Sequence, residues 1–228
     1  MNSWHLRPRA AFDLETTGRN PLTARIVTAS VVLVDEHGGL VEQHEWLADP
    51  GVDIPDEASA VHGITTATAV ARGSAAPLVV RQVASVLAGY FRAGIPVLAF
   101  NARYDFTVLA REGMRYGVST PDARPVLDPW VMDKQADRYR PGKRTLSAMC
   151  EHYGVELLNA HTSTADAAAT LAVGSKLAQR FEHLRRPAAE LHGSQIRWAR
   201  GQAASLQEYL RRMDPSAAVE GQWPAIAC

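Results

Sequence analysis

Two cysteines among 228 residues are too few to build the frameworks that cysteine usually supports. Cys150 and Cys228 lie far apart and show no C-x-x-C spacing. This pattern argues against a disulfide scaffold and against a zinc knuckle. We therefore expect a protein of reducing, cytoplasmic surroundings.

An excess of charge of one sign is also missing. Lys and Arg together number 24, Asp and Glu also number 24, and the formal net charge is zero. No bulk positive charge attracts nucleic acid, so a polyanion would have to be held by local patches or by metal. No apolar run approaches a membrane span, and residues 1–9 lack the apolar core of a signal peptide. We expect a soluble, unexported protein with no membrane partner.

The hydrophobic pattern predicts an α/β domain with an appendage. Residues 10–14 form a short apolar strand, and the β-branched run 25–35 is typical of a strand buried on both faces. Residues 40–47 alternate like the returning strand of a hairpin, which would give the first strand two antiparallel neighbours. The further expected elements are a loop at 49–63, helix 78–93, strand 96–100, a helix to about 116, strand 124–127, and helices capped by Asp128, by Thr145 and near Asp166.

The end of the first strand carries two carboxylates in the stretch Phe12-Asp13-Leu14-Glu15-Thr16-Thr17-Gly18. Residues two apart in a strand point to the same face, so Asp13 and Glu15 project together while Phe12 and Leu14 face the apolar side. Their repulsion raises a pKa or requires a cation between them, and hard ions such as Mg²⁺ or Mn²⁺ take oxygen ligands. A bare D-x-E would more often be a pair of solvated acids, so other parts of the chain must support a metal site.

Two further polar clusters follow apolar segments. The predicted strand 96–100 runs into Asn101-Ala102-Arg103-Tyr104-Asp105, which opens a helix. Polar residues that follow strands of an open α/β sheet commonly form its active site. His161 precedes Asp166 at the head of an alanine-rich helix. Taken alone, Asp105 and Asp166 could be acids favoured by helix dipoles.

Together these motifs resemble, in order and spacing, those of the DEDDh (DnaQ-like) 3′-5′ exonucleases, which include polymerase proofreading subunits. The resemblance covers roughly residues 8–182 and rests on Asp13-x-Glu15, Asn101-x-x-x-Asp105 and His161-x-x-x-x-Asp166. It implies a ribonuclease H-like mixed five-stranded sheet with flanking helices, to which this chain adds a C-terminal helical extension. We therefore divide the chain into an exonuclease domain (1–186) and a C-terminal amphipathic helix with an extended tail (187–228).

The resemblance also implies a reaction and its residues. Asp13, Glu15, Asp105 and Asp166 would bind two divalent ions, Mg²⁺ or Mn²⁺, and His161 would be the general base. These five residues are the expected catalytic set. The expected activity is hydrolysis from a free 3′ end of single-stranded DNA or RNA, which releases nucleoside 5′-monophosphates. An RNA-trimming enzyme and a catalytically silent nucleic-acid-binding scaffold remain alternatives, although no catalytic position is substituted.

Substrate contacts are predicted at four residues outside the carboxylate set. Thr16, Asn101 and Arg103 are candidates for holding the terminal nucleotide, and His62 lies in an H-G-I-T segment like that of the family. For His62, capping of a loop is an equal alternative. The basic loop with Arg138, Arg140, Lys143 and Arg144 around Tyr139 suggests phosphate contacts, and a solvated loop is nearly as good an explanation. No polymerase domain or clamp-binding Q-x-x-L-x-F-like box is found, so no polymerase partner is indicated.

The tail beyond Pro187 carries an apolar seam at alternating steps of three and four residues. The seam residues are Ala189, His192, Ile196, Ala199, Ala203, Leu206, Leu210 and Met213. It would pack on the domain itself or on a second copy of the chain, and we expect a homodimer through this helix. Trp223 lies in an extended apolar segment and needs a pocket.

Overall fold

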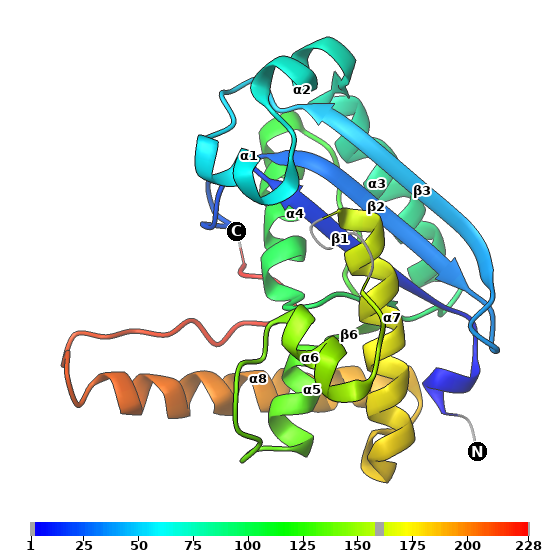
Figure 1. Ribbon diagram of the computed structural model, residues 1–228, viewed down its shortest axis with the longest axis vertical. Coiled ribbons are helices and arrows are strands. Elements are labelled where there is room, and N and C mark those ends of the chain that lie inside the picture. The colour runs from blue at the N-terminus through cyan, green and yellow to red at the C-terminus, as the bar shows by residue number, and fades with distance from the viewer. Residues whose placement is uncertain (1–2, 158–161, 228) are drawn as a thin grey trace.

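The computed structural model describes residues 3–157 and 162–227. A single mixed sheet is flanked by helices (Figure 1). The strands are β1 (Arg9–Thr16), β2 (Ile26–Val34), β3 (Leu40–Asp49), β4 (Ser74–Ala75), β5 (Val97–Leu98) and β6 (Val126–Leu127). The helices are α1 (Asp56–His62), α2 (Thr66–Arg72), α3 (Ala76–Arg92), α4 (Arg103–Tyr116), α5 (Pro129–Ala136), α6 (Leu146–Tyr153), α7 (Ser163–Arg180) and α8 (Ala188–Leu210), with 3₁₀ turns η1 (Trp4–Leu6) and η2 (Glu182–Leu184).

The sheet confirms the predicted fold class and corrects two of its details. Its order is β4-β3-β2-β1-β5-β6, so it has six strands rather than five. The additional strand, β4, is two residues long and pairs in parallel with β3, too short to show a period in the sequence. The first strand has only one antiparallel neighbour, β2, because β3 pairs with the other edge of β2 and β5 lies parallel to β1.

Two hydrophobic cores lie on opposite faces of the sheet. Phe12 and Leu14 pack in the core that includes α3 and α4, whereas Ala11 belongs to the core that includes α6 and α7. The period-2 alternation of β1 therefore places Asp13 and Glu15 on the α7 face. Helix α7 lies close to the sheet at Gly174, where an added Cβ would be 2.5 Å from Leu98 Cδ2. This close packing fixes the helix that carries Asp166.

The segment expected as a loop at 49–63 contains a helix instead. Helix α1 spans Asp56–His62 and has no buried residue, so it lacks the apolar stripe by which a helix is predicted. Asp56 and Glu57 lie in its first turn, where acidic side chains interact favourably with the helix dipole.

The C-terminal segment packs on the sheet edge and then projects from the body. Helix α8 contacts α5 and β6, and its far end extends beyond the rest of the molecule (Figure 1). The chain then returns toward α4, where Ile226 N donates to Thr107 Oγ1 at 2.9 Å. Trp223 is 7% exposed within the core, so it occupies the pocket that the sequence demands. Among the described residues, no helix is long and apolar enough to cross a membrane.

Candidate active site

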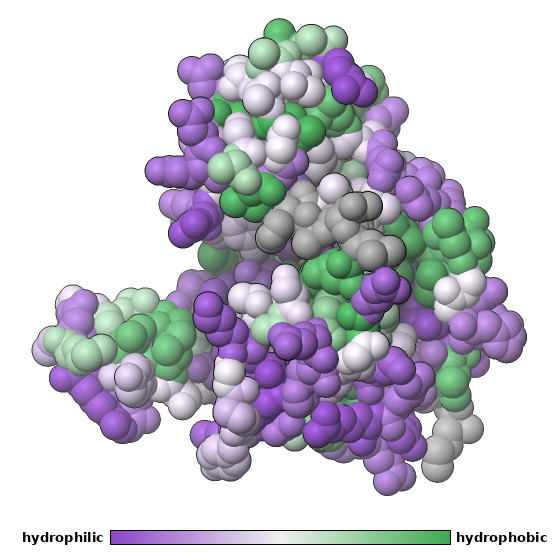
Figure 2. Space-filling view, viewed as in Figure 1, coloured by the Kyte–Doolittle hydropathy of each residue, from purple (hydrophilic) through white to green (hydrophobic). Residues whose placement is uncertain are grey.

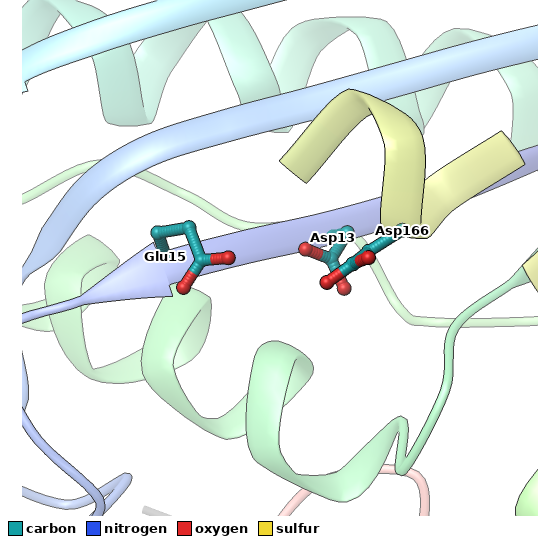
Figure 3. A group of neighbouring side chains, drawn as sticks. All are labelled: Asp13, Glu15 and Asp166. Carbon is teal, nitrogen blue, oxygen red and sulfur yellow. The ribbon is translucent and has the colours of Figure 1, made fainter. Parts of the chain in front are cut away.

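Two carboxylates of the site come from the end of β1. Asp13 and Glu15 project from the same face of the strand, and Figure 3 shows both beside Asp166 of α7. Asp13 pairs with Ser30 of β2 across the sheet, so its position is fixed by the centre of the sheet and not by a loop. This placement is the one that the D-x-E spacing predicts.

Asp166 completes a cluster of three acids. It lies in the first turn of α7, whose N-cap Thr162 accepts a hydrogen bond from Ala165 N at 3.4 Å. Ligand oxygens of Asp13, Glu15 and Asp166 all lie within 4.8 Å of one another. The head of a long helix and the end of a central strand thus bring together residues that are about 150 positions apart in the sequence.

Asp105 approaches the cluster from the opposite side of β1. It lies in the first turn of α4 and is 3% exposed. Its Oδ1 accepts the backbone N–H of Leu14 at 3.2 Å, and Leu14 is the residue between Asp13 and Glu15. The buried carboxylate is therefore joined directly to the strand that carries the acidic pair.

Burial and mutual repulsion make four negative charges at this site unfavourable, and the pKa values of three of the acids are raised as a result. Burial, followed by the charges of Asp105, Asp166 and Glu15, raises the pKa of Asp13 well above its ordinary range. Burial also raises the pKa of Asp105. For Glu15, burial and the charge of Asp166 raise the pKa to about 7. Without a cation, at least part of the cluster holds protons near neutral pH.

The donor set fits a hard divalent cation. Every contributing ligand atom is a carboxylate oxygen, which Mg²⁺ and Mn²⁺ prefer, and no thiolate or imidazole belongs to the group of three. A cation would also offset the repulsion that raises the pKa of Asp13 and Glu15. Asp13, Glu15 and Asp166 are therefore the residues that could hold such an ion, with Asp105 beside them.

Asn101 and Asp128 form the turn that leads into α4. Asn101 has φ 59, a left-handed backbone conformation that residues other than glycine rarely adopt. Asp128 holds this turn, because its carboxylate accepts the backbone N–H of Asn101 at 3.1 Å and that of Ala102 at 2.9 Å. It also caps α5 as predicted, accepting from Trp130 N at 2.9 Å. The sequence motif at Asp128 predicted the cap but not its link to Asn101.

Thr16 uses its hydroxyl to shape the chain just beyond the acids. The hydroxyl donates to Gly18 O at 3.0 Å and contacts the hydroxyl of Tyr104, which also donates to Gly18 O. In the sequence, only the position of Tyr104 next to Asp105 indicates that it lies near the site. Burial raises the pKa of Tyr104 to about 12, so its hydroxyl stays protonated.

His62 lies at the wall of a cavity of about 400 Å³ that also borders Glu15 and Ser163. Its Nδ1 accepts the backbone N–H of Ile64 at 3.2 Å, which is the loop-capping contact expected as one of two alternatives. Burial lowers its pKa, so the ring is neutral near pH 7. Because His62 also borders the cavity, its contact with substrate stays a prediction.

The basic side chains that the sequence predicts as substrate contacts bind other parts of the protein. Arg103 donates to the backbone carbonyl of Glu220 in the C-terminal segment and borders a cavity with Asn101. In the basic loop, Arg140 and Arg144 both bind Asp133, with N–O distances of 3.1 and 2.6 Å. These two arginines therefore have structural partners.

Two other basic-loop residues face solvent, and one expected site residue is not described. Tyr139 is 88% exposed and Lys143 is also exposed. His161 lies outside the described residues, so its predicted role as a base stays a prediction.

The known proteins that this chain resembles match the part of it that carries Asp13, Glu15, Asp105 and Asp166. The family model for RNase_T, described as an exonuclease, matches residues 10–173. A DNA polymerase III subunit epsilon-like protein of Rhodobacter capsulatus is 31% identical over 163 residues, which are 70% of this chain and 22% of that protein. This chain therefore spans less than a quarter of that relative.

Two solved structures share the fold. The zinc ion bound form of the E. coli ExoI–ssDNA complex superposes with a TM-score of 0.67 at 21% identity, covering 78% of this chain and 42% of that one. Exonuclease X in complex with 5′ overhanging duplex DNA gives a TM-score of 0.59 at 20% identity, covering 80% and 98% of the two chains. Both similarities show that this chain has the ribonuclease H-like fold.

Proposed function

The chain belongs to the exonuclease family whose model matches residues 10–173, and from this membership we propose that it is a metal-dependent 3′-5′ exonuclease. It would hydrolyse phosphodiester bonds from the 3′ end of single-stranded DNA or RNA and release nucleoside 5′-monophosphates. The proposal rests on one observation: carboxylate oxygens of Asp13, Glu15 and Asp166 lie within 4.8 Å of one another. The binding partner is accordingly a nucleic acid with a free 3′ end.

The carboxylates would hold two divalent ions, Mg²⁺ or Mn²⁺, through Asp13, Glu15 and Asp166 with Asp105 adjacent. Bound cations of this kind stabilise the negative charge that develops on the phosphate and on the leaving 3′-oxygen. The acids lie on β1, α4 and α7 rather than on loops, so they would be oriented before substrate arrives, which would lower the cost of reorganisation during the reaction.

His161 would take the proton from the attacking water. The unperturbed pKa of a histidine, about 6.5, suits proton transfer near neutral pH. Asp166 lies five positions after His161, at the head of α7. This spacing supports a base close to the acids.

The terminal nucleotide would be held by residues around the acids. Thr16 and Asn101 border the site through β1 and the turn before α4, and His62 borders the neighbouring cavity. Arg103 remains a candidate as well, although its bond to Glu220 gives it a structural function that the motif alone did not indicate.

DNA is the first substrate to test, because the matched relative is named as a DNA polymerase III subunit epsilon-like protein. End-labelled single-stranded DNA, duplex DNA and RNA should each be incubated with Mg²⁺, Mn²⁺ or a chelator. We expect stepwise loss from the 3′ end with either metal and none with the chelator. A folded protein that degrades none of the three with Mn²⁺ would instead be a binding scaffold, and faster loss of RNA than of DNA would identify a trimming exoribonuclease.

A further inference from the structure

A groove between α5 and α8 gathers positive charge away from the acid cluster. It encloses about 610 Å³, and its charged lining residues are Lys134, Arg138, Arg144 and Arg197. No Asp or Glu is among the described residues that line it. In a chain of zero net charge, this is a local electropositive surface of the kind that binds a polyanion.

The positive charge of the groove is only partly neutralised. Arg144 shares the carboxylate of Asp133 with Arg140, so two guanidiniums face one carboxylate and one positive charge is left over. Arg197 is exposed and is oriented by neutral acceptors, Gly193 O and Ser194 Oγ, each at 3.1 Å. Arg138 is exposed too. In the part of the chain that the structure describes, neither Arg138 nor Arg197 forms an ion pair.

Aromatic rings accompany these cations. Tyr209 is 58% exposed on the α8 side of the groove, and Trp198 lines the same wall. Lys134 Nζ lies 3.9 Å from the ring centroid of Trp130. Surfaces that bind single strands combine cations that follow the phosphates with rings on which bases stack. The groove offers both kinds of group.

The groove adjoins a smaller cavity that lies beside the turn preceding Asp105. Lys134, Gln202 and Leu206 also line this smaller cavity of about 50 Å³. Asn101 and Arg103 also line that cavity, and in the sequence they lead into the helix whose first turn holds Asp105. Figure 1 shows α5 and α8 next to each other below α4, and Figure 2 shows hydrophilic surface over the neighbourhood of α5 and α6.

We propose that the α5–α8 groove binds the phosphate backbone and bases of a single strand, upstream of the 3′-terminal nucleotides that enter the acid site. This rests on the proposed exonuclease function and extends it to a second contact region on the substrate. A single strand supplies both regularly spaced negative charges and flat bases, whereas an acidic peptide supplies only the charges. Strands too short to reach the groove are bound by the acid site alone, so affinity rises with strand length.

Binding can be measured without hydrolysis by fluorescence anisotropy in chelator with the full chain. Single-strand binding surfaces cover about 4–16 nucleotides, so 5′-labelled oligothymidylates of about 4 and about 20 nucleotides separate the two contact regions. The test variant is Arg138→Gln/Arg197→Gln. The matched control is Arg81→Gln/Arg92→Gln, which removes the same charge from exposed arginines of α3 that line a different cavity.

The test variant is expected to bind the long strand about 10-fold more weakly at low salt. The slope of log Kd against log salt should fall by about 1.4, since each phosphate contact to a single strand contributes about 0.7. Its binding and Mn²⁺-dependent hydrolysis of the short strand should match the wild type, and the control should match it with both strands. In the hydrolysis assay, KM for the long strand rises while kcat is retained.

Unchanged affinity of the test variant for the long strand overturns the proposal, as does an equal loss with short and long strands. A glutamate peptide of similar length provides a further arm. If the test variant loses affinity for that peptide but not for the strand, the groove is a protein-binding surface and the proposal is wrong. Failure of the exonuclease function would look different, because no strand of either length would be hydrolysed by the wild type.

Discussion

Trp223 donates its indole N–H to the carboxylate of Asp128, with Nε1 3.3 Å from Oδ2, although the two residues are 95 positions apart. The same oxygen accepts the backbone N–H of Ala102 at 2.9 Å, in the turn that precedes Asp105. Asn101 in this turn has the rare left-handed conformation, which persists only where surrounding contacts enforce it. The C-terminal segment therefore stabilises the backbone that positions one of the four acids.

Trp223→Phe should lower both stability and activity. Phenylalanine keeps an aromatic ring beside His192, whose ring centroid lies 5.1 Å from that of Trp223, but it removes the donor to a buried carboxylate. We expect the free energy of unfolding to fall by about 1–2 kcal/mol, since hydrogen bonds to charged groups are worth about 1.5–3 kcal/mol and Asp128 keeps other donors. Urea unfolding followed by circular dichroism measures the change. Turnover should fall as well, because the turn before Asp105 loosens.

Trp46→Phe is the matched control for this substitution. Trp46 stacks on His44 with ring centroids 5.5 Å apart, and no hydrogen bond of its indole is found among the described residues. The control should therefore change stability much less than Trp223→Phe. Equal losses in the two variants would contradict a specific role of the bond to Asp128.

Stability should depend on pH and on metal together. The folded state raises the pKa of Glu15 from 4.5 to about 7. A carboxyl group with a raised pKa keeps its proton in the folded state after the unfolded state has lost it, so stability falls as pH rises between these two values. A divalent cation favours the charged carboxylates and removes this loss. Mn²⁺ should therefore raise Tm more at pH about 8 than at pH about 5, which thermal unfolding with and without chelator will show.

Asp13→Asn is the informative variant for this experiment. It replaces a buried carboxylate whose pKa is raised by burial and by the charges of Asp105, Asp166 and Glu15, so the metal-free protein should be more stable than the wild type at the higher pH. Its Tm should respond little to Mn²⁺. An unaltered response to Mn²⁺ would show that the ion binds elsewhere.

The acid cluster could be predicted from the sequence because its determinants are local. Asp13 and Glu15 share a face through the period of a strand, while Asp105 and Asp166 lie in the first turns of helices that follow recognisable signals. Contacts over long sequence separations gave no such signal. The bond from Trp223 to Asp128 is the clearest case, since an indole in an extended tail indicates a need for burial but not the partner.

The basic loop shows the same limit of local reasoning. The run of basic residues suggests phosphate contacts, yet Arg140 and Arg144 both form ion pairs with Asp133. Tyr153 also donates a hydrogen bond to Asp133 at 2.5 Å. The partners of a charge depend on how α5, α6 and the loop between them pack. Some of the basic residues without an acidic partner, such as Arg197, belong to α8, which is far from the basic loop in the sequence.

His161→Ala should separate the proposed base from the metal ligands. Loss of a general base lowers turnover by about 10²–10⁴-fold. Metal affinity should change little, because carboxylate oxygens already form the cluster at Asp13, Glu15 and Asp166 and imidazole is a poor ligand for Mg²⁺. Single-turnover hydrolysis together with a Mn²⁺ titration measures both quantities. Loss of metal binding in this variant would make His161 a ligand rather than a base.

The apolar seam of α8 has two different environments. Ile196 and Ala199 pack against the core of the domain, whereas Leu206 and Met213 are 43% and 75% exposed on the projecting end of the helix. Figure 2 shows hydrophobic surface on this projecting part of the molecule. Full burial of a large apolar side chain is worth about 1.5–3 kcal/mol, so a second copy of the chain would gain by covering Met213 at the end of the helix, beyond the α5–α8 groove.

We therefore predict a homodimer formed through the end of α8. Light scattering on the full chain should give the mass of a dimer, and Met213→Glu should convert it to a folded monomer by placing charge in the contact. Val70→Glu, at a residue 60% exposed on α2, is the matched control and should leave the dimer intact. Surface variants are sharper than truncation after Arg186, because truncation also removes Gln195, which accepts Asp128 N at 2.7 Å. A wild-type chain that is monomeric at all accessible concentrations would refute the prediction.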